Sequence, residues 1–179
     1  GNSGPGGSGP ATKRYVDANV SITPNDVNEV KGQHVFTITS VASPAAGTTA
    51  SLTSITPSVS PAPTSQSSTC ANPQVNGNTA TCTLTINSDN VGVFTANAVA
   101  VWHFADAANP PNTADVTRST SANSGPGGTG PAVKRYVEAN VSITPNDVNE
   151  VKGQHVFTIT SVATASGTTA SLTSITTTV

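Results

Sequence analysis

The chain has 179 residues, a formal net charge of −2 and only 9% charged and 4% aromatic residues, whereas Ser and Thr together number 50. A charge this close to zero argues against nucleic-acid binding, which would need a basic stripe. No apolar run approaches the roughly 20 residues of a membrane span. Thr, Val and Ile favour strands, and the 13 Pro and 15 Gly predict turns between them. The apolar residues alternate with polar ones, which argues against a disordered chain.

The sequence repeats with a period of 121 residues. Residues 2–42 align with residues 123–163 without a gap, and only three pairs differ: Ser8/Thr129, Thr12/Val133 and Asp17/Glu138. A fixed period of this length predicts domains in tandem rather than a single globule. We therefore expect one complete unit and the first part of a second.

Two segments rich in Gly and Pro mark the expected domain boundaries. Residues 1–12 and 122–133 have no apolar periodicity and are predicted to be semi-extended linkers. The complete unit is then expected over residues 13–121, and the incomplete one over residues 134–179. Because the incomplete unit contains only the early strands, we expect strands from a neighbouring subunit or from the continuing chain to complete it.

Alternation of apolar and polar residues predicts strands along the complete unit. The expected strands are residues 15–23, 33–41, 50–59, 81–87, 91–104 and 114–121. Turns are expected at Pro24-Asn25-Asp26 and Ser88-Asp89-Asn90. No stretch has a helical period. About seven short strands in a unit of this size predict an all-β fold, with immunoglobulin-like β-sandwich domains in tandem.

Cys70 and Cys82 are the only cysteines. Two ligands are too few for a zinc site, so a structural disulfide is predicted, in an oxidising compartment. Closing so short a loop would stabilise the fold by roughly 3 kcal/mol. Asn76-Gly77, between the two cysteines, offers the turn that would bring the sulfurs together.

Three segments carry a resemblance to a known family. VSITPNDVNEVKGQHVFTIT, CTLTINSDNVGVFTANAVAVW and ADVTRST resemble bacterial immunoglobulin-like repeats, which occur in tandem in large secreted or surface proteins. The resemblance covers residues 15–120 and again residues 136–176. It implies a spacer, stalk or fibre. Since immunoglobulin-like cores often bury one Trp against the disulfide, we expect Trp102 in the core rather than on a ligand-stacking surface.

Candidate sites for chemistry are few. His34 and His155 occupy equivalent positions and are expected at the edge of the core, and His103 is expected at the surface. Asn25–Glu29 could bind calcium, although a solvated turn is the favoured interpretation. An isopeptide crosslink is not expected, because Lys13 and Lys31 lack the inward position that it needs. With no nucleophile elbow, phosphate loop or Cys/His pair, the sequence predicts no enzyme, cofactor or metal site.

These features predict an extracellular or cell-surface structural protein. The strands carry few of the charges that normally protect sheet edges, so self-association into a fibre or filament is expected. The alternative is an adhesin, a carbohydrate- or receptor-binding module of a larger surface protein.

Overall fold

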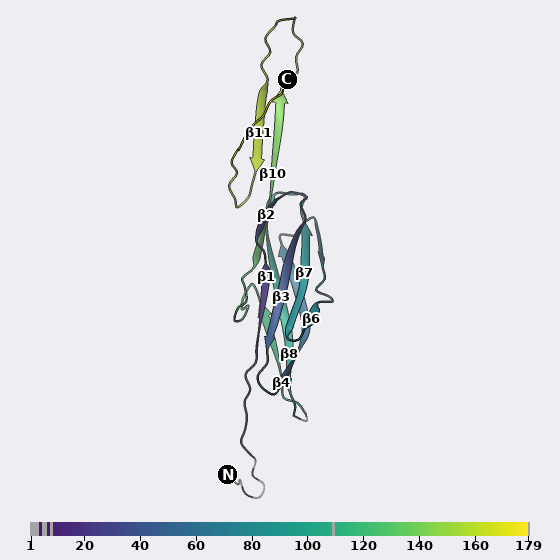
Figure 1. Ribbon diagram of the computed structural model, residues 1–179, viewed down its shortest axis with the longest axis vertical. Helices are drawn as coiled ribbons and strands as arrows, with labels where there is room; N and C mark the ends of the chain where they lie inside the picture. Colours follow the sequence, from purple (N-terminus) through teal and green to yellow (C-terminus); the bar gives the residue numbers. More distant parts are fainter. Residues whose placement is uncertain (1–3, 5–6, 8, 109, 179) are drawn as a thin grey trace.

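The structure, a computed structural model, describes residues 4, 7, 9–108 and 110–178. All the regular elements in these ranges are strands, which confirms the all-β prediction. A helix able to cross a membrane is not found among the described residues. The strands form two sheets that pack on a shared core, in the manner of a β-sandwich (Figure 1).

The first sheet is antiparallel and begins with β1 at its edge. Its order is β1 (Asp17–Thr23), β3 (His34–Ser43), β7 (Thr79–Asn87) and β5 (Ser65–Ser68), and β6 (Gln74–Asn76) also pairs with β7. In the β6–β7 hairpin Asn76 pairs with Thr79, and Gly77 has a positive φ of 58°. The turn therefore lies at Gly77-Asn78, one residue beyond the expected Asn76-Gly77, and the predicted disulfide between Cys70 and Cys82 is confirmed.

The second sheet is built around β8 (Gly92–Asp106). β4 (Thr48–Ser60) pairs with one side of β8, and β9 (Thr113–Ser119) and β10 (Ala132–Thr144) pair with different parts of β8. Beyond β10 lie β2 (Asp26–Glu29), which is parallel to it, and β11 (Thr158–Thr164). β2 begins inside the expected turn at 24–26 and continues as a strand because β10 supplies it with a partner.

The core confirms the predicted inward faces. From the first sheet Val20, Ile22, Phe36, Ile38, Leu84 and Ile86 are buried, and from β8 Phe94, Ala96, Ala98, Ala100 and Trp102 are buried. The small alanines of β8 let the two sheets approach closely in the middle of the core. Trp102 is fully buried, as expected, and its Nε1 donates to Ser40 Oγ across the core at 2.9 Å.

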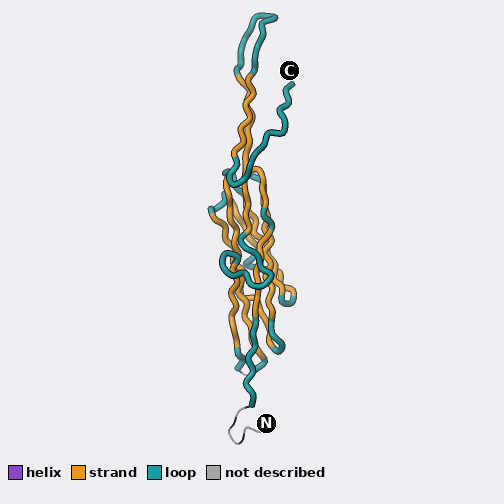
Figure 2. Tube along the Cα trace, turned by 90° about the vertical axis from the view of Figure 1, so that its left-hand side faces the viewer, coloured by secondary structure: helices purple, strands orange, loops and turns teal. Residues whose placement is uncertain are grey.

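The hairpin of β10 and β11 projects from one end of the sandwich, and the N-terminal residues extend from the opposite end (Figures 1 and 2). The register of the β10–β11 hairpin reproduces that of β1 and β3. Ile22 pairs with Ile38 in the first copy, and Ile143 pairs with Ile159 in the second. The environment differs, because Ile22 is 2% exposed and Ile143 is 58% exposed. The second copy thus forms the hairpin of the first copy without the strands that would cover it.

The boundary expected between residues 133 and 134 falls within a continuous strand. β10 starts at Ala132, inside the segment expected to be a linker, and continues to Thr144. Its first part belongs to the sheet of the preceding unit, and its second part pairs with β11. The strand therefore joins the two copies directly.

Candidate functional site

The most distinctive site in the structure is the place where the second copy enters the sandwich of the first. We call residues 123–137 the inserted segment. Its first part crosses the open edge of β1: Val20 N donates to Ser124 O at 2.9 Å, and Thr129 N donates to Val20 O at 3.2 Å. The hydroxyl of Thr129 accepts from Ile22 N at 3.0 Å. These bonds satisfy backbone groups that an unprotected edge strand would leave open for another chain.

The second part of the inserted segment is a strand of the other sheet. Ala132 to Tyr136 pair antiparallel with β8, from Ala96 to Gly92, while Lys134 to Val137 pair in parallel with β2. Two further bonds fix the strand, from Val133 N to Asn25 Oδ1 at 2.7 Å and from Val30 N to Val137 O at 2.9 Å. This part of the segment is therefore an inner strand of the sheet, with a paired strand on each side.

Tyr136 anchors the inserted segment in the core. Its side chain is fully buried, its hydroxyl donates to Ile86 O at 3.1 Å, and its ring meets the ring of Phe94 edge-on at 5.6 Å. The equivalent residue of the first copy, Tyr15, is 83% exposed. The same side chain is thus a core residue in one copy and a surface residue in the other.

Lys134 is fully buried beside Tyr136. Its Nζ donates to Asp26 Oδ2 at 2.9 Å and lies 5.2 Å from the centre of the Tyr136 ring. Burial lowers the pKa of Lys134, against the opposing effect of Asp26. The hydrogen bond from Lys134 is the main reason that the pKa of Asp26 is lowered. This pair offsets part of the cost of burying the ammonium group and connects the inserted segment to β2.

His34 completes this polar cluster at the edge of the core. It is 6% exposed, its Nδ1 lies 3.3 Å from Asp26 Oδ2, and its Nε2 lies 3.4 Å from Pro24 O, so the expected core-edge position is confirmed. Burial, followed by the charge of Lys134, lowers the pKa of His34. The folded chain therefore favours neutral His34.

The cluster predicts a pH dependence with two windows. The folded-state pKa of His34 lies below its usual 6.5, so the unfolded chain binds the proton first and the free energy of unfolding falls as the pH decreases below about 6.5. The lowered pKa of Asp26 adds stability that is present above its usual 3.8 and is lost as the pH falls further. Urea unfolding between pH 7.5 and 3 measures both. We expect His34→Gln to remove the loss between pH 6.5 and 5 and to keep the loss near pH 4; an unchanged profile would contradict this assignment.

Two glycines let the inserted segment approach β1. Gly125 has a φ of +76°, and a Cβ there would collide with Ala18 O; a Cβ on Gly128 would come within 2.6 Å of Val20 O. Both obstacles are backbone atoms, which cannot move aside as a side chain can. Gly125 and Gly128 therefore allow the backbone of the inserted segment to approach the backbone of β1 closely. The Gly/Pro-rich sequence instead predicts a linker.

We expect Gly125→Ala to lower the free energy of unfolding by about 2 kcal/mol, through the clash and the left-handed backbone. Gly4→Ala is the matched control, since Gly4 has a similar φ of +75° and nothing lies within 4 Å of a Cβ there. Chemical denaturation of both variants checks this. Equal losses would mean that the contact with Ala18 has no energetic role.

Other residues considered from the sequence lie apart from this site. His103 is at the surface, as expected, and pairs with Asp115 at 2.7 Å, while His155 lies 3.3 Å from Pro145 O in the projecting hairpin. Lys13 lies over Tyr15. No group of three or more His, Cys, Asp or Glu side chains able to hold a metal is found among the residues that the structure describes. Asn25 and Asp26, two of the candidate calcium ligands, instead accept hydrogen bonds from Val133 N and Lys134 Nζ.

The sequence reasoning missed Lys134 and Tyr136 as buried anchors. Alternation places Val16, Ala18, Val20 and Ile22 inward, which puts Tyr15 on the outer face, and the same pattern puts Tyr136 there. The available signal was the near identity of the expected linkers, since a spacer without contacts does not need a fixed sequence.

Comparisons with family models, with curated proteins and with solved structures found no match to this chain. The repeat and the geometry of the inserted segment are therefore the observations that bear on the function of this chain.

Proposed function

We propose that this chain is part of an extracellular structural protein in which immunoglobulin-like sandwiches follow one another and build a stalk, fibre or filament. One observation carries the proposal: β10 is a single strand that belongs to the sheet of one unit and continues into the hairpin of the next. A joint of this kind transmits tension through ladder hydrogen bonds and buried side chains. A flexible linker would transmit tension only through its covalent backbone.

The period of the sequence supports a repeated joint. The residues that make the joint in the second copy are present in the first copy at a distance of 121 residues, and only Ser8/Thr129 and Thr12/Val133 differ between residues 2–16 and 123–137. Successive units of this kind would therefore connect in the same way. The sandwich is elongated, and its two connections leave from opposite ends (Figure 1), as a linear array requires.

The disulfide supports a location outside the cell. Cys70 and Cys82 are joined, and structural disulfides persist in oxidising compartments. The low charge of the strands and the exposed apolar face of the projecting hairpin are consistent with a chain that associates with further units.

Electron microscopy of the protein isolated from its source tests the proposal. We expect continuous filaments of even width with a regular axial repeat. Isolated globular particles that bind a glycan or a receptor would contradict it and favour the alternative of a binding module. Trp102, the residue most suited to a carbohydrate platform, is fully buried, so the structure offers that alternative no aromatic surface at this residue.

A further inference from the structure

We propose that residues 2–16 are a donor strand for a sandwich other than that of their own unit, and that a second copy of this chain can supply that sandwich. They would insert into a sandwich of that copy in the way that residues 123–137 insert into the sandwich of the first unit. The proposal rests on the proposed tandem array, and it identifies the strand by which one molecule would join another. The acceptor position lies between β8 and β2, where residues 132–137 pair in this structure. It would be open in any unit of this kind whose own following segment is absent or weakened.

Residues 2–16 have nearly the same sequence as the inserted segment. Residues 2–16 and 123–137 share 13 of 15 residues, and both differences preserve the contacts seen in the structure. Ser8 keeps the hydroxyl with which Thr129 accepts from Ile22 N. At the position of Val133 the contact is made by the backbone N–H, which donates to Asn25 Oδ1, so Thr12 can make the same bond.

The side chains of residues 11–15 are exposed, whereas their equivalents in the inserted segment are partly or fully buried. Residues 9–16, which we call the N-terminal arm, form no strand. Tyr15 is 83% exposed and Lys13 lies 5.9 Å from the centre of its ring. Their equivalents Tyr136 and Lys134 are fully buried. The arm therefore presents, in solvent, the two side chains that anchor the inserted segment.

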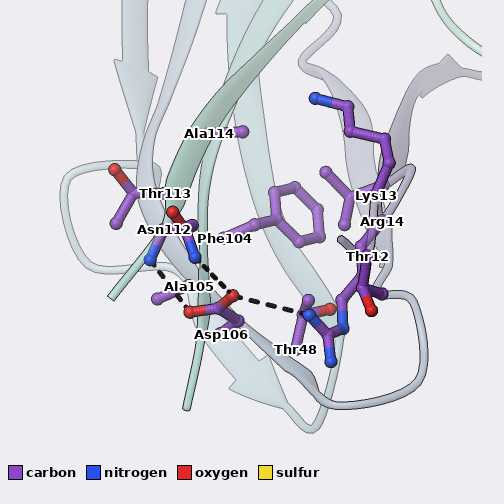
Figure 3. A pocket seen from close by; sticks show the side chains of 11 residues that line it. Thr12, Lys13, Arg14, Thr48, Phe104, Ala105, Asp106, Asn112, Thr113 and Ala114 are labelled. Carbon is purple, nitrogen blue, oxygen red and sulfur yellow. Dashed lines mark hydrogen bonds and ion pairs between the residues drawn. The ribbon is translucent and has the colours of Figure 1, made fainter. Parts of the chain in front are cut away.

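Arg14 binds the N-terminal arm to its own unit. Its Nη1 lies 3.5 Å from Asp106 Oδ2 (Figure 3). Its Nε donates to Ala46 O at 3.1 Å. Asp106 is itself fixed by hydrogen bonds from Ala108 N and from Asn112.

Alternation along an extended chain places Lys13 and Tyr15 on the side opposite Arg14. One side of the arm is thus bound to its own unit, and the other is free to enter a second one. In the inserted segment the corresponding alternation is visible, because Lys134 and Tyr136 are fully buried whereas Arg135 is only partly buried.

The test uses the full chain with its own inserted segment weakened. Tyr136→Ala removes a buried ring, which weakens insertion in cis by at least about 100-fold. A tethered segment acts at an effective concentration on the order of 1 mM, so the intact arm of a second copy should replace it above about 10 µM. Analytical ultracentrifugation at 100 µM should show head-to-tail dimers and longer chains for Tyr136→Ala. The double variant Tyr15→Ala/Tyr136→Ala should stay monomeric.

Register-specific crosslinking identifies the contact. Because Arg135 pairs with Val93, Arg14 of one copy should pair with Val93 of the other. A chain carrying Arg14→Cys, mixed with a Tyr136→Ala chain carrying Val93→Cys, should form an intermolecular disulfide. The same mixture with Asn97→Cys in place of Val93→Cys should not, since Asn97 lies four residues further along β8.

Two outcomes overturn the proposal: Tyr136→Ala remains monomeric with a folded sandwich, or its oligomers persist unchanged when Tyr15 is also replaced. If Tyr136→Ala does not fold, the milder Tyr136→Phe chain is titrated with a synthetic peptide of residues 2–16, up to millimolar concentration. Binding of this peptide, and at least tenfold weaker binding of its Tyr15→Ala form, supports the proposal; no binding overturns it. A filament in the native material together with no effect of Tyr15 would leave the proposed function intact and refute only this joint.

Discussion

Replacing Tyr136 by Ala should lower the free energy of unfolding of the sandwich by about 3–5 kcal/mol, because a fully buried aromatic ring is lost from the core. The hydrogen bond from its hydroxyl to Ile86 O is lost as well. Urea unfolding at 1 µM, followed by the fluorescence of the single Trp102, measures this loss below the concentration at which copies would associate.

Tyr15→Ala is the matched control for this prediction. Tyr15 has the same neighbours in sequence, Arg14 and Val16 matching Arg135 and Val137, but is 83% exposed. Its replacement should change the free energy of unfolding by no more than about 0.5 kcal/mol. Equal effects of the two replacements would mean that Tyr136 does not belong to the core of the first unit.

Removing the disulfide is expected to have the second large effect. Replacing both Cys70 and Cys82 by Ala should lower the free energy of unfolding by about 3 kcal/mol, since the bond closes a loop with a sequence separation of 12 and restricts the unfolded chain. Both cysteines are also buried in the core, at 5% exposure each.

Reduction of the unaltered chain provides the control for the disulfide. Dithiothreitol should produce a loss similar to that of the double replacement, without any change in side-chain volume. A difference of less than about 1 kcal/mol between the oxidised and reduced chains would contradict the prediction and place the stability of this region in the β6–β7 hairpin alone.

The strands of the first unit could be predicted from the sequence because each has one face in the core. Alternation located β7 and β8 closely, and it assigned Leu84, Phe94 and Trp102 to the interior. β5 and β6 are exposed along their length, with no apolar face to mark them, and they were not predicted. The disulfide followed from the count of cysteines alone.

The inserted segment could not be predicted by the same reasoning, because β10 contributes to two units. One face of the strand is buried in the first unit, and the other face matches the buried face of the repeated strand β1. Ala132, Lys134 and Tyr136 face the core of the first unit. The following residues Ala139, Val141 and Ile143 match Ala18, Val20 and Ile22, so by the repeat they belong to the inward face of the second unit. Alternation describes one buried face at a time, and only the three-dimensional arrangement shows that the phase changes along the strand.

The buried Lys134 shows a second limit of the sequence. A lysine next to an arginine, directly after a segment rich in Gly and Pro, is typically exposed. Its burial depends on Asp26, which is 108 residues away in the chain and lies beside Lys134 because β2 pairs with β10. Such a pair has no local signature, although the polar cluster it forms decides where the inserted segment docks.

Hydrogen exchange of the full chain tests most directly the claim that residues 132–137 are part of the first sandwich. The sequences of residues 133–137 and 12–16 differ at one position, so their intrinsic exchange rates are nearly the same. We predict that the hydrogen-bonded amides of residues 133–137 exchange as slowly as those of β8, and that those of residues 12–16 exchange at the rate of an open chain. Rapid exchange of both segments would contradict the account, because the second copy would then be joined to the first by a linker and not by a shared strand.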